Sequence, residues 1–187
     1  MLVDAISNLV ASAQNLSLVL VGIGGHGAAG KTTLARTVPG AVIVSTDEFW
    51  TGSGFALDQV RTAVLDPLRK GSVASYESWN WATKTTNGTR HIEPGGVVIV
   101  EGVCALHKML RDFYDVKVWV ETPRDVRLER AVKRDGESER DQWINVWMPN
   151  EDAYVESDRP LRCADLVVNG LTNDWTVGGG FDHTKPF

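Results

Sequence analysis

The amino-acid sequence predicts an α/β fold in which helices cover both faces of a mainly parallel sheet. Short apolar runs alternate with helical patterns along the chain, and this alternation is typical of parallel strands that are connected by helices. The chain has 187 residues, of which 43% are apolar and 23% charged. That size suffices to bury a core without disulfides or a structural metal. We therefore expect residues 1–187 to form a single domain.

Strands are expected where short apolar runs are bounded by glycine or polar residues. These runs are Leu16–Ile23, Ala41–Val44, Val97–Val100, Val116–Val120 and Leu166–Val168. A first helix is expected at about residues 31–37. A second precedes Gly71 and repeats apolar residues every four positions, and Pro67 is predicted to bend it or end it early.

Two more helices are expected in the second half of the chain. Thr122 is predicted to be the N-cap of the first and Pro123 its first residue, and Gly136 is predicted to end it. Residues 137–154 are predicted to contain a polar segment and a further helix, in which Glu151 and Tyr154 either contact adenine or a lid or form a plain helix face. The tail at 178–187 is predicted to be loose.

Charge and cysteine content exclude several classes of protein. The net charge of −5 argues against broad binding to a nucleic-acid backbone. Polar residues interrupt the apolar N-terminus, so neither a signal peptide nor a membrane-spanning helix is expected there, and no membrane partner is expected. Two cysteines, Cys104 and Cys163, cannot form a disulfide framework. We expect a cytoplasmic protein, with a homo-oligomer left open.

A glycine-rich motif follows the first predicted strand and precedes the first predicted helix. The stretch Gly25-His26-Gly27-Ala28-Ala29-Gly30-Lys31-Thr32 matches a glycine, four residues and Gly-Lys-Thr, the P-loop pattern. Its glycines allow backbone N–H groups to point at phosphate oxygens, while Lys31 can reach the β- and γ-phosphates and Thr32 suits Mg²⁺. The predicted fold is therefore the three-layer sandwich of P-loop NTPases. The predicted nucleotide-binding residues are Gly25, Gly27, Ala28, Ala29, Gly30, Lys31, Thr32 and Thr33.

Two acidic residues at predicted strand ends favour a small-molecule kinase among P-loop proteins. Asp47 could take the proton of an acceptor hydroxyl or hold Mg²⁺ through water, although a loop aspartate that caps a turn would give the same pattern. Glu101 ends a buried strand and could hold Mg²⁺ or contact substrate, or be a solvated carboxylate. The sequence contains neither a guanine-reading Asn-Lys-x-Asp nor a transporter Leu-Ser-Gly-Gly-Gln motif.

A run of arginines favours a small helical lid at about residues 124–150. Arg127, Arg130 and Arg134 share one helix face, and phosphoryl transfer needs positive charge over the phosphates. Acidic residues lie between them, so a solvated face of ion pairs explains the pattern equally well. Arg134 is the preferred candidate for a phosphate contact.

The sequence resembles the uridine kinase family of P-loop nucleoside and small-metabolite kinases, which is related to phosphoribulokinase and bacterial pantothenate kinase. The resemblance lies in the phosphate loop, Thr46-Asp47-Glu48-Phe49, Tyr76 between serine and glutamate, Val98–Gly102 and the arginine run. It implies ATP and Mg²⁺ as cofactors, Asp47 as general base and Tyr76 in the acceptor site. Members that use uridine carry a histidine five residues after that tyrosine and an arginine two further on, and these positions are here Trp81 and Thr83.

Taken together, these observations predict an ATP-dependent kinase that phosphorylates a hydroxyl of a small metabolite, with nucleosides as the leading acceptor class. Other metabolite alcohols, nucleoside monophosphates and a non-catalytic nucleotide-binding regulator are the alternatives. Trp79 and Trp81 either stack on the acceptor or pack on one strand face. The predicted catalytic residues are Lys31, Asp47 and Arg134. The predicted substrate contacts are Asp47, Tyr76, Trp81 and Glu101, and the predicted metal ligands are Thr32 and Glu101.

Overall fold

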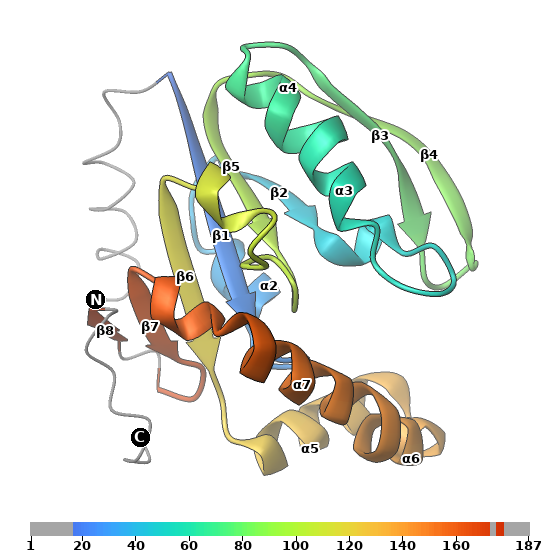
Figure 1. Ribbon diagram of the computed structural model, residues 1–187. Coiled ribbons are helices and arrows are strands. Elements are labelled where there is room, and N and C mark those ends of the chain that lie inside the picture. The colour runs from blue at the N-terminus through green and yellow to red at the C-terminus, as the bar shows by residue number, and fades with distance from the viewer. Residues whose placement is uncertain (1–16, 173–174, 178–187) are drawn as a thin grey trace.

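A computed structural model describes residues 17–172 and 175–177 and contains a six-stranded sheet at its centre (Figure 1). The strand order is β2-β5-β1-β6-β7-β8, and all neighbours pair in parallel except β7 and β8. The strands are β1 (Leu18–Gly25), β2 (Val42–Ser45), β5 (Gly96–Glu101), β6 (Val116–Glu121), β7 (Leu166–Asn169) and β8 (Trp175–Val177). The predicted α/β sandwich with a mainly parallel sheet is confirmed, although the strand over Leu166–Val168 is not the last one because β8 follows it.

The two faces of the sheet bury separate cores, as expected for strands that are apolar throughout. Every residue of β1 is buried, and alternate side chains enter opposite cores. Val19, Val21 and Ile23 pack with the short helix α2 (Lys31–Ala35) on one face. Leu18 and Leu20 lie on the other face, where the core also includes Tyr76 and apolar residues of a long helical segment. These cores fix the carboxyl ends of β1, β2 and β5 at one edge of the sheet.

That long helical segment consists of α3 (Leu57–Gln59), a π-helical stretch η2 (Val60–Leu65) and α4 (Asp66–Arg69). Val60, Val64 and Leu68 are buried in the core, as their spacing predicts. Pro67 does not end the helix, which continues through it to Arg69. The wider π-helical turns precede this proline.

An antiparallel hairpin that the sequence patterns do not predict lies outside the main sheet (Figure 1). It pairs β3 (Ala74–Asn80) with β4 (Thr85–Ile92). β4 is mostly polar and exposed, so it lacks the hydrophobic alternation by which strands are predicted. Trp79 belongs to β3 but Trp81 follows its end, so the two tryptophans do not form one strand face.

The C-terminal half adds a helical layer and several short turns. After η3 (Arg111–Phe113) and β6 come α5 (Arg124–Asp135), η4 (Glu137–Glu139) and a nearly continuous helix formed by α6 (Arg140–Gln142), η5 (Trp143–Trp147) and α7 (Met148–Asp158), followed by η6 (Pro160–Cys163). Gly136 ends α5 as predicted. Pro123 rather than Thr122 is the N-cap, because the Thr122 hydroxyl donates instead to the Ala29 carbonyl at 2.9 Å.

Among the described residues, no helix has the length and apolar character required to cross a bilayer. Cys104 and Cys163 are both free thiols. The predicted tail at 178–187 lies outside the described residues.

Gly102 lies where the chain turns immediately after Glu101, and we expect Gly102→Ala to destabilise the protein by about 2–4 kcal/mol. Its φ is +152°, and an added Cβ would lie 1.8 Å from Oγ1 of the fully buried Thr46. Urea denaturation measures the change. Gly54→Ala is the control, since this position has ordinary backbone geometry and open space. Equal unfolding midpoints for Gly102→Ala and the wild type would contradict this packing.

Candidate active site at the carboxyl edge of the sheet

The phosphate loop connects β1 to α2 and includes residues 25–32. Gly25 and Gly30 have φ of +151° and +106°, and a Cβ on Gly25 would lie 2.6 Å from the Val120 carbonyl oxygen. Both positions therefore require glycine. Lys31 is buried, and its Nζ donates to the His26 carbonyl at 2.8 Å. Burial lowers the pKa of this ammonium group, whereas the nearby Glu101, Asp47 and Glu151 raise it.

Thr32 and Glu101 form the second part of the site. The Thr32 hydroxyl donates to Oε1 of Glu101 at 3.0 Å, and Glu101 is opposite both Ile23 and Ser45 in the strand register. Burial raises the pKa of Glu101, and the positive charge of Lys31 opposes this shift. A hydroxyl and a carboxylate are the hard oxygen ligands that Mg²⁺ prefers. The pair fits that ion, although nowhere in the described part of the chain do three or more His, Cys, Asp or Glu side chains gather into a metal site.

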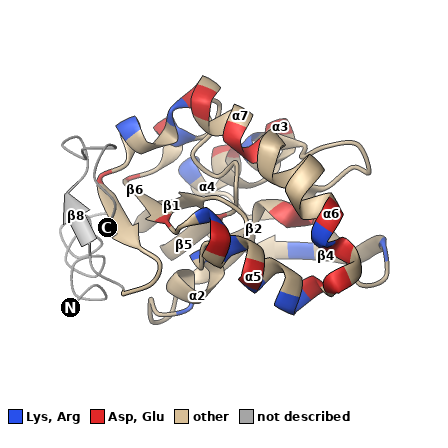
Figure 2. Cartoon of the chain, turned by 90° about the horizontal axis from the view of Figure 1, so that it is seen from below, with Lys and Arg blue, Asp and Glu red and all other residues tan. Residues whose placement is uncertain are grey.

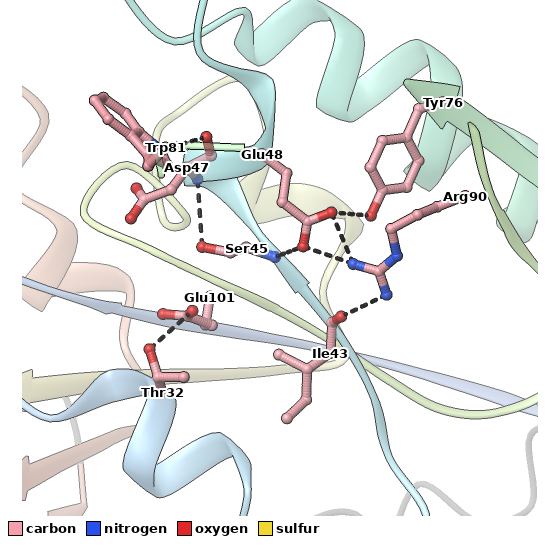
Figure 3. Close-up of polar contacts among 9 residues, drawn as sticks. All are labelled: Thr32, Ile43, Ser45, Asp47, Glu48, Tyr76, Trp81, Arg90 and Glu101. Carbon is pink, nitrogen blue, oxygen red and sulfur yellow. Dashed lines mark hydrogen bonds and ion pairs between the residues drawn. The ribbon is translucent and has the colours of Figure 1, made fainter. Parts of the chain in front are cut away.

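Asp47 lies on η1 (Thr46–Phe49), the 3₁₀ turn that directly follows β2. Ser45 caps this turn: its Oγ accepts the Asp47 N–H and its own N–H donates to Glu48, both at 3.3 Å. In Figure 3 the Asp47 carboxylate points away from Glu48, on the side of Thr32 and Glu101. The side chain of Asp47 is exposed, yet the surrounding protein desolvates its carboxyl group and raises its pKa, an effect that the charges of Lys31 and Arg134 partly offset.

Glu48 points the other way and binds Tyr76 and Arg90 of the hairpin (Figure 3). The Tyr76 hydroxyl donates to Oε2 at 2.8 Å, and Arg90 Nη1 lies 2.6 and 2.7 Å from the two carboxylate oxygens. Arg90 also donates to the Ile43 carbonyl at 3.1 Å. Tyr76 is thus brought near this edge of the sheet, but it is buried in the core, where its ring stacks on Phe49. Glu48 could be found from its capping-box spacing with Ser45, whereas no sequence signal indicates Arg90.

Aromatic side chains gather beside Asp47. The Trp81 indole N–H donates to the Asp47 carbonyl at 3.0 Å, and 46% of Trp81 remains exposed. Its ring centroid is 5.2 Å from that of Trp50, which is in turn 5.2 Å from that of Phe55. We call Trp50, Phe55 and Trp81 the aromatic wall. It leaves a partly exposed ring surface next to a carboxylate, where a planar or apolar group could stack.

The three arginines of the predicted lid face have different surroundings, and Figure 2 shows acidic and basic residues interleaved on α5. Arg127 is buried and its Nε donates to the Thr122 carbonyl at 3.0 Å. Arg130 binds the Gly170 carbonyl at 3.0 Å and lies close to the phosphate loop. Arg134 is exposed and forms a two-pronged ion pair with Asp135. Only Arg134 therefore combines a solvent-exposed guanidinium with an electrostatic effect on Asp47 and Lys31.

The parallel sheet, the loop between its central strand and the next helix, and the acidic residues at the ends of β2 and β5 define a P-loop kinase. The chain belongs to the phosphoribulokinase / uridine kinase family, whose model matches residues 49–176. The phosphate loop and Asp47 precede the matched residues, so they are assigned from their own pattern and geometry.

Individual proteins that are similar in sequence or structure are also described as uridine kinases. A uridine kinase of Staphylococcus haemolyticus is 28% identical over 180 residues, covering 80% of this chain and 86% of its own. A uridine kinase of Staphylococcus aureus is 32% identical over 113 residues, covering 56% of this chain and 54% of its own. The solved structure of a possible uridine kinase from Bacillus stearothermophilus has a TM-score of 0.68 at 18% identity, covering 89% of this chain and 96% of that one.

Proposed function

We propose that this chain is an ATP-dependent kinase that transfers the γ-phosphoryl group to a hydroxyl of a small metabolite, with nucleosides as the leading acceptor class. The observation that carries the proposal is the convergence of the phosphate loop, the Thr32–Glu101 pair and Asp47 at one sheet edge. A protein that only binds nucleotide needs the loop but neither a second acid nor a carboxylate directed to the same edge.

Each group has a role that follows from its chemistry. Bound Mg·ATP supplies the phosphoryl group and a cation that neutralises its charge. The loop amides and Lys31 hold the phosphates, while Thr32 and Glu101 hold the magnesium ion, directly or through water. Asp47 accepts the proton of the acceptor hydroxyl, and Arg134 brings positive charge to the transferred group once it exchanges Asp135 for phosphate.

The acceptor is proposed to bind between Asp47 and the hairpin. Trp81 would contact its flat or apolar part. Tyr76 is only 6% exposed and its hydroxyl donates to Glu48, so we propose that it supports the wall of this site from the core through Glu48 and Arg90. Trp81 and Thr83 occupy the positions of the histidine and arginine that the resemblance associates with uridine. This difference favours a second candidate function, a kinase for another metabolite alcohol, with the same site chemistry.

A coupled assay of ADP release tests the function. We would supply ATP, Mg²⁺ and, one at a time, nucleosides, sugars, pantothenate and nucleoside monophosphates. We expect one class to raise ADP release well above the rate with ATP alone. Release that no acceptor raises above this background would contradict the proposed kinase and favour a nucleotide-binding regulator.

Trp81→Ala is expected to raise the KM of the acceptor about three- to tenfold, because a stacking surface worth about 0.5–1.5 kcal/mol is lost. Trp81→Phe keeps a ring but removes the N–H that holds the Asp47 carbonyl, so it separates stacking from positioning. The KM for ATP serves as the internal control and should stay constant. An unchanged acceptor KM in Trp81→Ala would exclude the aromatic wall from the acceptor site.

A further inference from the structure

Glu151 contacts the phosphate loop although 124 residues separate it from Gly27. It lies on α7 and only 9% of its surface is exposed. Its Oε2 accepts the N–H of Gly27 at 3.0 Å. The sequence patterns leave this residue between a lid contact and a plain helix face. The structure places it against the loop that the proposed function assigns to the phosphates of ATP.

The absence of a side chain at Gly27 leaves room for this helix to pack against the loop. A Cβ added at Gly27 would lie 2.5 Å from Oε1 of Glu151 and 2.7 Å from the Trp143 ring. Unlike Gly25 and Gly30, Gly27 does not have a φ in the left-handed region. The third position of the motif therefore needs glycine for space against the helix, not for its backbone conformation.

Charged groups on three elements surround the Glu151 carboxylate. Arg127 of α5 is 96% buried, with Nη1 3.6 Å from Oε2 of Glu151, and Lys31 acts on it from the phosphate loop. Asp152, the next residue on α7, forms an ion pair with Arg124. Its Oδ1 also lies 3.3 Å from Nε2 of His26 of the loop, and burial lowers the pKa of this histidine to about 4. Two successive acids of α7 thus bind the loop and the start of α5 together. Burial raises the pKa of Glu151, while the Gly27 N–H, Lys31 and Arg127 lower it.

We propose that Glu151 is a positioning residue that seats α7 on the phosphate loop through the Gly27 N–H and so holds the loop in its curled form before nucleotide arrives. This inference rests on the proposed nucleotide site. In this proposal the Gly27 N–H binds α7 rather than phosphate, the other loop amides are left for the phosphates, and Glu151 makes no contact with ATP. Without this contact the nucleotide would have to order the loop when it binds, and the conformational entropy lost in that ordering would weaken binding.

Calorimetric titration of ADP and of a non-hydrolysable ATP analogue, with Mg²⁺, tests the proposal on the full chain without any acceptor. We expect Glu151→Ala to raise Kd about tenfold, which corresponds to about 1.4 kcal/mol. Glu151→Gln keeps an oxygen that accepts the Gly27 N–H and should stay within about threefold of the wild type. Gly27→Ala should raise Kd as Glu151→Ala does, because its Cβ pushes α7 away.

Glu156→Ala and Gly54→Ala are the matched controls. Glu156 is an exposed carboxylate on the same helix, and Gly54 has open space and ordinary geometry; both variants should bind as the wild type. A wild-type chain without affinity for nucleotide would refute the proposed function itself. A wild type that binds, with unchanged or tighter binding in Glu151→Ala and Gly27→Ala, would refute only the role of Glu151. If Glu151→Ala does not fold, Gly27→Ala and Glu151→Gln decide.

Discussion

Asp47→Asn is expected to lower kcat by about 10²–10⁴-fold, because asparagine keeps the size of the side chain but cannot accept the proton of the acceptor hydroxyl. The measurement is steady-state ADP release with the acceptor found in the panel. The Kd of nucleotide, measured by calorimetry, is the control and should change little. Full turnover by Asp47→Asn would show that this carboxylate is not the base.

The pH profile provides an independent test of the same carboxylate. Desolvation raises the pKa of Asp47, and only the deprotonated form can act as a base. We therefore expect kcat/KM to fall as the pH decreases through this raised pKa, at higher pH than for an ordinary aspartate, whose pKa is about 3.9. The Asp47→Asn variant should lose this acidic limb while any limb due to other groups remains.

Lys31→Ala is expected to reduce kcat/KM for ATP by about 10²–10³-fold, since it removes a buried positive charge that faces the phosphates. Lys31→Met is the companion variant, because it retains most of the side-chain volume and separates charge from packing. Lys70→Ala, at an exposed lysine, should leave the rate unchanged. Wild-type affinity of Lys31→Met for ATP would contradict the assignment of the phosphate site.

Local sequence patterns predict much of the fold because the central strands are buried on both faces. Apolar runs of β-branched residues placed β5 and β6 to within a residue at each end. The hairpin could not be predicted in this way. Its strand β4 is polar and is held by pairing with β3 and by the ion pair between Arg90 and Glu48.

The site residues likewise fall into those that local sequence patterns predict and those that they do not. The loop, Asp47 and Glu101 could be found from the sequence because each follows a recognisable strand, and the carboxyl ends of parallel strands meet at one edge. Arg90 could not be found, and the role of Glu151 stayed open between a ligand contact and a plain helix face, because their partners are 42 and 124 residues away. Arg127 was predicted with the lid arginines, but periodicity cannot distinguish a buried guanidinium that binds a backbone carbonyl from an exposed one.

The turn that carries Asp47 is fastened to the hairpin on two sides. Glu48 binds Tyr76 and Arg90, and Trp81 binds the Asp47 carbonyl. An acceptor that contacts Trp81 therefore acts, through the indole N–H, on the same short backbone segment that orients the Asp47 carboxylate. In this scaffold, discrimination between acceptors would be expressed in turnover as well as in affinity, since a poorly fitting acceptor also misaligns the carboxylate. Selection for a new acceptor among hairpin variants should accordingly be scored by kcat, because binding screens alone would retain variants that hold their ligand but do not phosphorylate it.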